Sequence, residues 1–188
     1  MKKSTRILIC MAAVAGVGTA LCLSSCSVAP KNAAPVRQFD ITRYAGTWYE
    51  IARIEFRHER NMNNVSAQYS IRPDGKVNVL NSGYNYKKQN WEKAEGKAKF
   101  RGAHNVGALK VSFFGPFYSG YNVVALDEQY RYALVAGKNL DYLWILSREK
   151  NIPEDVKESY LNIARNIGYD TSRLVWVDHN RNENPYHQ

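Results

Sequence analysis

From Gly46 onward the sequence breaks into eight short segments in which apolar and polar residues alternate, separated by residues typical of turns. A period of two is typical of β-strands that bury one face. Turn chemistry is clearest at Arg72-Pro73-Asp74-Gly75 and Gly137-Lys138-Asn139. The predicted strands span 48–54, 65–71, 77–84, 91–100, 108–114, 121–127, 132–136 and 142–147. Many short strands that hairpins can join predict an all-β antiparallel barrel or sandwich.

One later segment has the period of a helix. Its apolar residues recur every three or four positions, at Val156, Tyr160, Ile163 and Ile167. Pro153 suits the first turn of this helix, and Gly168 supplies its end. We expect the apolar stripe to lie against the outside of the sheet, and a last short strand to follow over 174–177.

Alternation also predicts which side chains face the interior. Lys110 and Ser112 are expected to point to water, so Leu109, Val111 and Phe113 point inward. An eight-stranded barrel encloses an interior that is either filled by side chains or holds one small ligand. The candidates for a cavity wall are Val65, Ala67, Tyr69, Val79, Phe100, Val111, Phe113, Tyr121, Val123 and Trp144, with Asn81 as a further polar group. For each residue alone, a place in a filled core is an equally good interpretation.

Residues 1–25 have the composition of a secretory signal peptide. A basic start with Lys2, Lys3 and Arg6 precedes an uncharged stretch over 7–23, which falls short of the roughly 20 apolar residues of a bilayer span. The sequence Leu23-Ser24-Ser25-Cys26 resembles a bacterial lipobox. This resemblance implies cleavage before Cys26, lipid attachment to that cysteine and, with Ser27 following it, an outer-membrane location. The alternative is an ordinary secreted protein in which Cys26 is incidental.

Removal of the signal peptide changes the chemistry that the chain can carry. All three cysteines (Cys10, Cys22 and Cys26) lie at or before the cleavage point, so the mature domain has no disulfide, thiolate metal site or cysteine nucleophile. The formal net charge falls from +9 to +6 with the three basic residues of the signal. We predict a signal peptide over 1–25, a lipidated tether over 26–38 that keeps the domain off the membrane, a barrel over 39–180 and a polar tail over 181–188.

Three positions carry a resemblance to a known family. The run Gly46-Thr47-Trp48 at the start of the first strand resembles the Gly-x-Trp signature of lipocalins, and Arg148 resembles the family arginine that packs over this tryptophan. Asp127 stands where the family has the acid of a Thr-Asp-Tyr motif, but this chain reads Leu126-Asp127-Glu128 and meets that motif only in part. The resemblance covers about residues 39 to 177 and is nearest to the apolipoprotein D-like lipocalins of bacterial outer membranes.

The resemblance implies a specific fold and function. The fold is an eight-stranded up-and-down barrel with one C-terminal helix outside it, plugged at one end by a cation–π contact between Trp48 and Arg148. The implied function is binding or transport of a long-chain fatty acid or lysophospholipid, for lipid salvage or envelope maintenance, by a protein anchored through Cys26 and facing the periplasm. The alternative is a structural or partner-binding envelope lipoprotein with a filled barrel. The sequence leaves open whether the protein forms a homodimer.

Other classes of function lack their signatures. The chain has no zinc-protease, nucleophile-elbow, phosphate-loop or dinucleotide motif, so we predict a binding protein and no cofactor. The enzymatic lipocalin that isomerises prostaglandins uses a cysteine, which the mature domain lacks. Single, scattered histidines (His58, His104, His179 and His187) argue against a metal site, and aromatic residues at strand alternation argue against nucleic-acid binding.

Two charged segments leave alternatives open. The segment between the first two strands carries Arg53, Arg57, His58 and Arg60 together with Glu55 and Glu59, and it suits either an anionic headgroup or a solvated loop. Residues 87–101 hold six basic side chains and two acidic ones, which suit either contact with an anionic bilayer or an ordinary solvated face.

Overall fold

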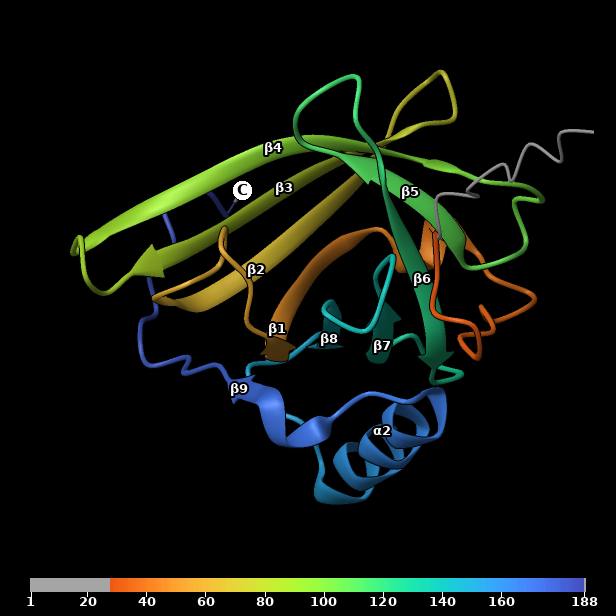
Figure 1. Cartoon of the computed structure of the whole chain (residues 1–188). Coiled ribbons are helices and arrows are strands. Elements are labelled where there is room, and N and C mark those ends of the chain that lie inside the picture. Colours follow the sequence, from red (N-terminus) through yellow and green to blue (C-terminus); the bar gives the residue numbers. More distant parts are fainter. Residues whose placement is uncertain (1–27, 188) are drawn as a thin grey trace, which may run out of the picture.

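The computed structural model describes residues 28–187, so the predicted signal peptide and Cys26 lie outside the described residues. An antiparallel sheet runs in the order β2-β3-β4-β5-β6-β7-β8-β1 and closes because β1 also pairs with β2 (Figure 1). The barrel strands are β1 (Gly46–Ile54), β2 (Met62–Ile71), β3 (Val77–Asn85), β4 (Asn90–Phe100), β5 (Ala108–Ser112), β6 (Ser119–Leu126), β7 (Tyr132–Ala136) and β8 (Leu143–Ser147). The predicted eight-stranded barrel is confirmed. A ninth strand, β9 (Leu174–Trp176), pairs with the last three residues of β1.

The predicted helix is α2 (Glu154–Ile167), which lies along the outside of the barrel (Figure 1). Its buried residues Tyr160, Leu161, Ala164 and Ile167 share one core cluster with the outward side chains of β7 and β8. Gly168 ends the helix at φ +111°, a conformation that favours glycine. Leu143 and Ile145 pack under α2, whereas Trp144 and Leu146 face the interior. The two apolar faces of β8 are therefore both covered.

One end of the barrel is closed by residues around Trp48, whose side chain is fully buried. A short helix that the sequence pattern does not reveal, α1 (Ile41–Tyr44), crosses this end, and the Asp40 carboxylate accepts the N–H of Thr42 to begin it. The guanidinium carbon of Arg148 lies 4.0 Å from the centroid of the Trp48 ring. Gly46 has φ +95°, and a Cβ there would lie 3.3 Å from Nη1 of Arg148. Glycine is therefore needed at this position.

Asp127 organises the turn between β6 and β7 at the same end of the barrel. Its Oδ1 accepts the backbone N–H groups of Arg131 and Tyr132, and its Oδ2 accepts that of Gln129. The acid of the partly matched motif therefore holds a turn and does not contact the cavity.

Residues 28–38, here called the N-terminal segment, lie on the outside of β6. The backbone N–H of Val36 donates to Val123 O at 2.8 Å, and the Asn122 side chain donates to Val28 O at 2.9 Å. Ala33 is buried in the cluster under α2. The described part of the predicted tether is therefore bound to the barrel and does not stand free of it.

Residues 178–187, here called the C-terminal segment, bind the outside of β2 and β3. The N–H of Asn64 donates to Asp178 O, the Asn184 amide donates to Ser82 Oγ, and the His187 ring is 2.7 Å from Ser66 Oγ. These contacts are hydrogen bonds between polar groups. The predicted polar tail is thus part of the folded domain up to His187.

Candidate ligand-binding cavity

A cavity of about 600 Å³ lies inside the barrel and opens at the end opposite Trp48. Nine of the eleven predicted wall residues line it: Val65, Ala67, Tyr69, Val79, Asn81, Val111, Phe113, Tyr121 and Trp144. Volumes of 300–1,000 Å³ are typical of small-molecule sites. Whether these residues contact a ligand stays a prediction.

Phe100 and Val123 do not line the cavity. The Phe100 ring stacks on His104 at 4.6 Å between centroids and meets the edge of Phe39, so it belongs to the closed end. Val123 is fully buried beside Gly107 and Val36. Both side chains point inward as alternation predicts, but they lie too near the closed end to reach the cavity.

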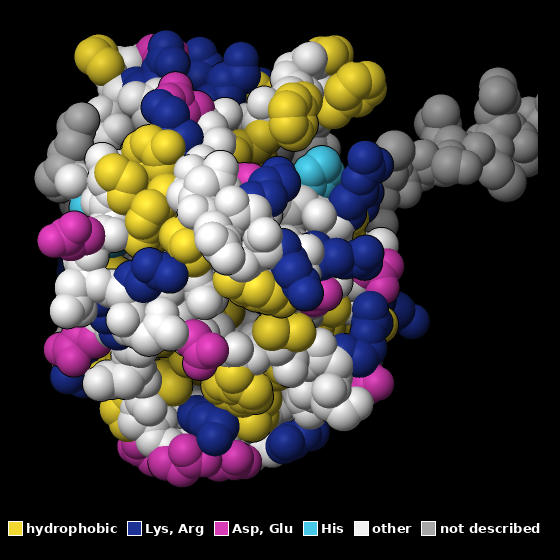
Figure 2. Space-filling model, turned by 90° about the vertical axis from the view of Figure 1, so that its left-hand side faces the viewer, with side chains coloured by type: hydrophobic (Ala, Val, Ile, Leu, Met, Phe, Trp, Pro, Cys, Tyr) yellow, Lys and Arg dark blue, Asp and Glu magenta, His cyan; other side chains and the backbone are white. Residues whose placement is uncertain are grey.

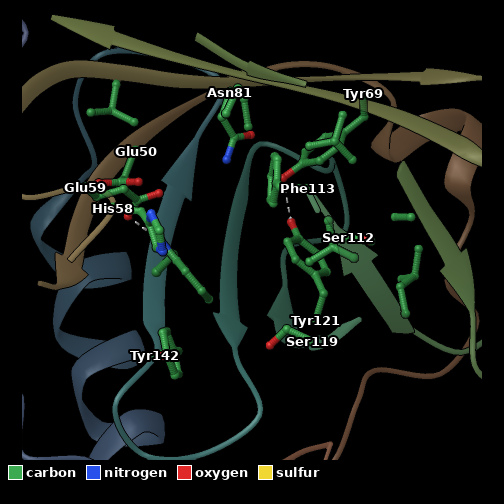
Figure 3. A pocket seen from close by; sticks show the side chains of 18 of the residues that line it. Glu50, His58, Glu59, Tyr69, Asn81, Ser112, Phe113, Ser119, Tyr121 and Tyr142 are labelled. Carbon is green, nitrogen blue, oxygen red and sulfur yellow. Dashed lines mark hydrogen bonds between the residues drawn. The ribbon is translucent and has the colours of Figure 1, made fainter. Parts of the chain in front are cut away.

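Three tyrosines form a hydroxyl chain in the cavity wall. Tyr121 Oη lies 2.7 Å from Tyr44 Oη and 2.9 Å from Tyr69 Oη, and Figure 3 shows Tyr69 and Tyr121 directed at each other. Burial raises the pKa of all three hydroxyls, so they stay protonated at neutral pH. Two hydrogen bonds use two of the three O–H protons. The third can donate to a ligand oxygen.

Toward the open end the cavity carries a buried acidic cluster. Arg53 Nη1 donates to Glu50 Oε1 at 2.8 Å, Arg53 Nε lies 3.9 Å from Glu59 Oε2, and Trp144 Nε1 donates to Glu59 Oε2 at 3.1 Å. Burial raises the pKa of Glu59 well above its ordinary value, and the nearby Glu50 carboxylate raises it further. Burial likewise raises the pKa of Glu50. The carboxyl groups of this cluster therefore hold protons more tightly than free glutamates do.

The structure corrects the expectation for the charged loop after β1. The Arg53 side chain is only 1% exposed and is paired with glutamates, so it cannot meet a headgroup. Arg57 is exposed, and Arg60 is exposed beside Glu55. His58 lies at the rim, where its ring centroid is 6.2 Å from that of Phe114 (Figure 3).

Two polar atoms in the cavity wall are buried without a hydrogen-bond partner among residues 28–187: Asn81 Oδ1 and Ser112 Oγ. Alternation predicts that Ser112 points to water, but this residue is 4% exposed. The predicted exposure is therefore wrong: Ser112, the last residue of β5, is buried and lines the cavity. Unpaired buried polar atoms cost free energy, so a bound water or ligand atom would satisfy both.

Several cavity residues are absent from the sequence prediction: Tyr44, Glu50, Glu59, Ser112, Phe114 and Phe117. Most lie in α1, in loops or at strand ends, where alternation gives no signal. In the described part of the chain, no three His, Cys, Asp or Glu side chains gather as a metal site would require. No described helix is long and apolar enough to span a bilayer.

Comparison with known proteins identifies relatives over most of the chain. Residues 39–179 match the family model of the lipocalin-like domain. The outer membrane lipoprotein Blc of Citrobacter freundii is 52% identical over 166 residues, 87% of this chain and 94% of the relative. The protein of the same name from Escherichia coli K12 is 51% identical over the same shares. Apolipoprotein D of Macaca fascicularis is 30% identical over 92% of this chain and 94% of its own.

Solved structures show the same fold at greater distance. Insecticyanin from the tobacco hornworm Manduca sexta superposes with a TM-score of 0.61 at 23% identity, covering 77% of this chain and 83% of that protein. At this identity the likeness concerns the fold alone.

Proposed function

The chain belongs to the lipocalin family, and we propose that it is an outer-membrane lipoprotein, anchored through Cys26, that binds a long-chain fatty acid or a lysophospholipid in its barrel. The anchor rests on the lipobox-like sequence before Cys26 and on relatives named as outer membrane lipoproteins that are about half identical to this chain. The division of the chain at residues 26, 39 and 181 is part of this proposal, with the described residues of the tether and tail packed on the outside of the barrel.

The lining of the cavity is the observation that supports an amphiphilic ligand with an acyl chain. Its walls include Val65, Val79, Val111 and Phe113, and burial of an acyl chain gains about 0.8 kcal/mol per CH₂. Polar atoms occur at separate places in this wall: the tyrosine hydroxyls, Asn81 Oδ1 with Ser112 Oγ, and the acidic cluster nearer the mouth. An amphiphile with a long tail and one polar end suits such a lining better than a uniformly apolar or uniformly polar ligand.

We propose binding and not catalysis, because no group in the described cavity wall is arranged as a nucleophile with its base. Ser112 Oγ has no hydrogen-bond partner among the described residues, and the tyrosine hydroxyls hydrogen-bond one another with raised pKa values. Glu59 is engaged by Trp144 and Arg53. A lipid incubated with the protein should therefore be recovered chemically unchanged.

The test combines native mass spectrometry with displacement of a fluorescent fatty acid. Protein purified from its own envelope should carry a lipid of one of the two classes, and the mass identifies which. Ala67→Trp fills the cavity wall and should lower probe affinity at least about tenfold. Ala103→Trp, in an exposed loop at the closed end, is the matched control and should leave affinity unchanged. Absence of both a co-purifying lipid and probe displacement would favour the filled-barrel alternative.

A further inference from the structure

The loop between β5 and β6 exposes two phenylalanines at the rim of the cavity. Phe114 is 71% exposed and Phe117 is 78% exposed, the largest exposures among the large hydrophobic residues of the described chain. Both also line the mouth of the cavity. We call residues 113–118 the aromatic loop. In the view of the open end, hydrophobic side chains project at the upper right, with Lys and Arg side chains below them (Figure 2).

Two lysines stand at the base of the aromatic loop. Lys99 Nζ and Lys110 Nζ lie 5.0 and 5.4 Å from the centroid of Tyr118, the last residue of the loop. Neither lysine has an ion pair among residues 28–187, whereas Lys88 in the turn before β4 and Lys93 in β4 are paired with Glu92 and Glu95. Exposed aromatic side chains above unpaired cations are complementary to a bilayer with anionic headgroups.

The N-terminal segment begins beside this loop. Its course runs from Val28, held by Asn122 near the start of β6, past Val36, paired with Val123, to Phe39 at the closed end. Gly120 makes room for it, because a Cβ on Gly120 would lie only 1.9 Å from Val28 O. The segment therefore leaves the barrel at the rim beside Gly120, which is three residues along the chain from Phe117.

Chain length limits how far a lipid on Cys26 can lie from this exit. Cys26 and Val28 are two residues apart, so their Cα atoms are at most about 7 Å apart. An anchor at Cys26, which rests on the proposed function, thus holds the rim beside the membrane and leaves no long spacer between them.

We propose that the aromatic loop docks on the phospholipid bilayer that holds the anchor, with Phe114 and Phe117 among the headgroups and Lys99 and Lys110 facing anionic phosphates. The cavity mouth then adjoins the bilayer, and an amphiphile moves between the two without crossing bulk water. The N-terminal segment, residues 28–38, acts as a strap that orients the barrel and not as a spacer.

The test uses the acylated protein reconstituted in vesicles of phosphatidylethanolamine and phosphatidylglycerol. Lipid attachment consumes the Cys26 thiol, so Phe117→Cys introduces a single site for an environment-sensitive fluorophore. Val175→Cys is the matched control, since Val175 is an exposed apolar residue of β9, which lies beside α2 on the side of the barrel away from the aromatic loop (Figure 1). We expect the label at 117 to be quenched by brominated lipid and to lose most of its quenching by aqueous iodide, and the label at 175 to behave in the opposite way.

A label at 117 that is as accessible to iodide as the one at 175 would overturn the proposal. Flotation separates this result from failure of the anchor: protein that does not float with the vesicles contradicts lipid attachment, whereas floating protein with an accessible loop contradicts only the orientation. In a third sample, Gly120→Ala is added to Phe117→Cys to displace Val28. We expect it to float but to regain iodide quenching; unchanged protection would refute the role of the strap.

Discussion

Arg148 closes the barrel through a set of contacts that only a guanidinium can make, so Arg148→Lys should destabilise the protein. Its Nη2 donates to the carbonyl oxygens of Arg43, Tyr44 and Ala45 at 2.9–3.1 Å, and its Nη1 donates to Thr47 O at 2.7 Å. Its Nε donates to Tyr130 O at 3.2 Å. The same group stacks on Trp48 at 4.0 Å. These contacts join α1, β1 and the turn before β7.

The expected loss in the free energy of unfolding follows from the contacts that a lysine ammonium group cannot make. A lysine carries its three N–H donors on one nitrogen, so it can donate to the carbonyls at the end of α1 but cannot also reach Thr47 O and Tyr130 O. It also lacks the planar group that stacks on Trp48. A hydrogen bond to a charged group contributes about 1.5–3 kcal/mol, and a cation–π contact about 0.5–2 kcal/mol. Because Arg148 is only partly buried, water replaces some of this, and we expect a net loss of about 2–4 kcal/mol.

The loss should appear as a fall in Tm of roughly 5–15 °C by circular dichroism, at 2–4 °C per kcal/mol for a chain of this size. Affinity for a fluorescent fatty acid should change little, because Arg148 does not line the cavity. The control is Arg131→Lys at the same end of the barrel, whose side chain is 58% exposed beside Asp127 and should cost less than about 1 kcal/mol. A variant Arg148→Lys as stable as this control would refute the closing role of the guanidinium.

Three further predictions concern the cavity wall and the strap. Gly96→Ala should cost about 1–3 kcal/mol in urea unfolding, because its Cβ would lie 2.8 Å from both the Phe113 ring and Ser112 O; Gly102→Ala, with open space around it, is the neutral control. Burial raises the pKa of Glu59, so the folded protein binds the proton of this carboxyl group more tightly than the unfolded chain does. The contribution of this proton to folding stability is complete below the ordinary glutamate pKa and is lost as pH rises toward the pKa of Glu59 in the folded protein. The stability of Glu59→Gln relative to wild type should therefore increase as pH rises from 4 to 8, by at most about 1.4 kcal/mol in the free energy of unfolding per pH unit. Thermal melts at several pH values check this, and parallel profiles of Tm against pH for the two proteins would contradict it. Asn122→Ala should cost about 2–4 kcal/mol, because the buried amide donates to Val28 O, Ala136 O and Gly137 O and accepts from Arg101; thermal melts that match wild type would show that these bonds contribute nothing net.

Sequence alternation predicts the side of the sheet that a residue faces, but it does not predict the depth of the residue along the barrel. This is why Phe100 and Val123 point inward yet belong to the closed end, while nine other candidates reach the cavity. The helix stripe from Val156 to Ile167 is predictable for the same reason, because an apolar face must be covered.

A strand irregularity hides the acidic cluster from the sequence pattern. With a strict period of two, Glu50 and Arg53 would point to opposite faces of β1, and the charges after Arg53 favour an exposed loop. The pairing of β1 with β8 instead shifts register between Glu50 and Ala52. One extra residue there brings both side chains to the same side, where they form a buried ion pair. The sequence does not predict that the N-terminal and C-terminal segments pack on the barrel. Hydrogen bonds between polar groups hold both segments, and these bonds leave no hydrophobic pattern in the sequence.

The two unpartnered polar atoms help to separate a ligand-binding barrel from a filled one. A barrel packed only for stability would place apolar groups at these positions, since a buried polar atom without a partner costs about 1–3 kcal/mol. Asn81 Oδ1 and Ser112 Oγ both occur in the cavity wall, and the tyrosine chain leaves one donor unused in the same space. These donors and this acceptor lie at separate places in an apolar wall, where either place can pair with the polar end of an amphiphile while its tail contacts the apolar lining. Apolar side chains at these positions would stabilise a filled barrel better, so the polar atoms favour the ligand-binding interpretation.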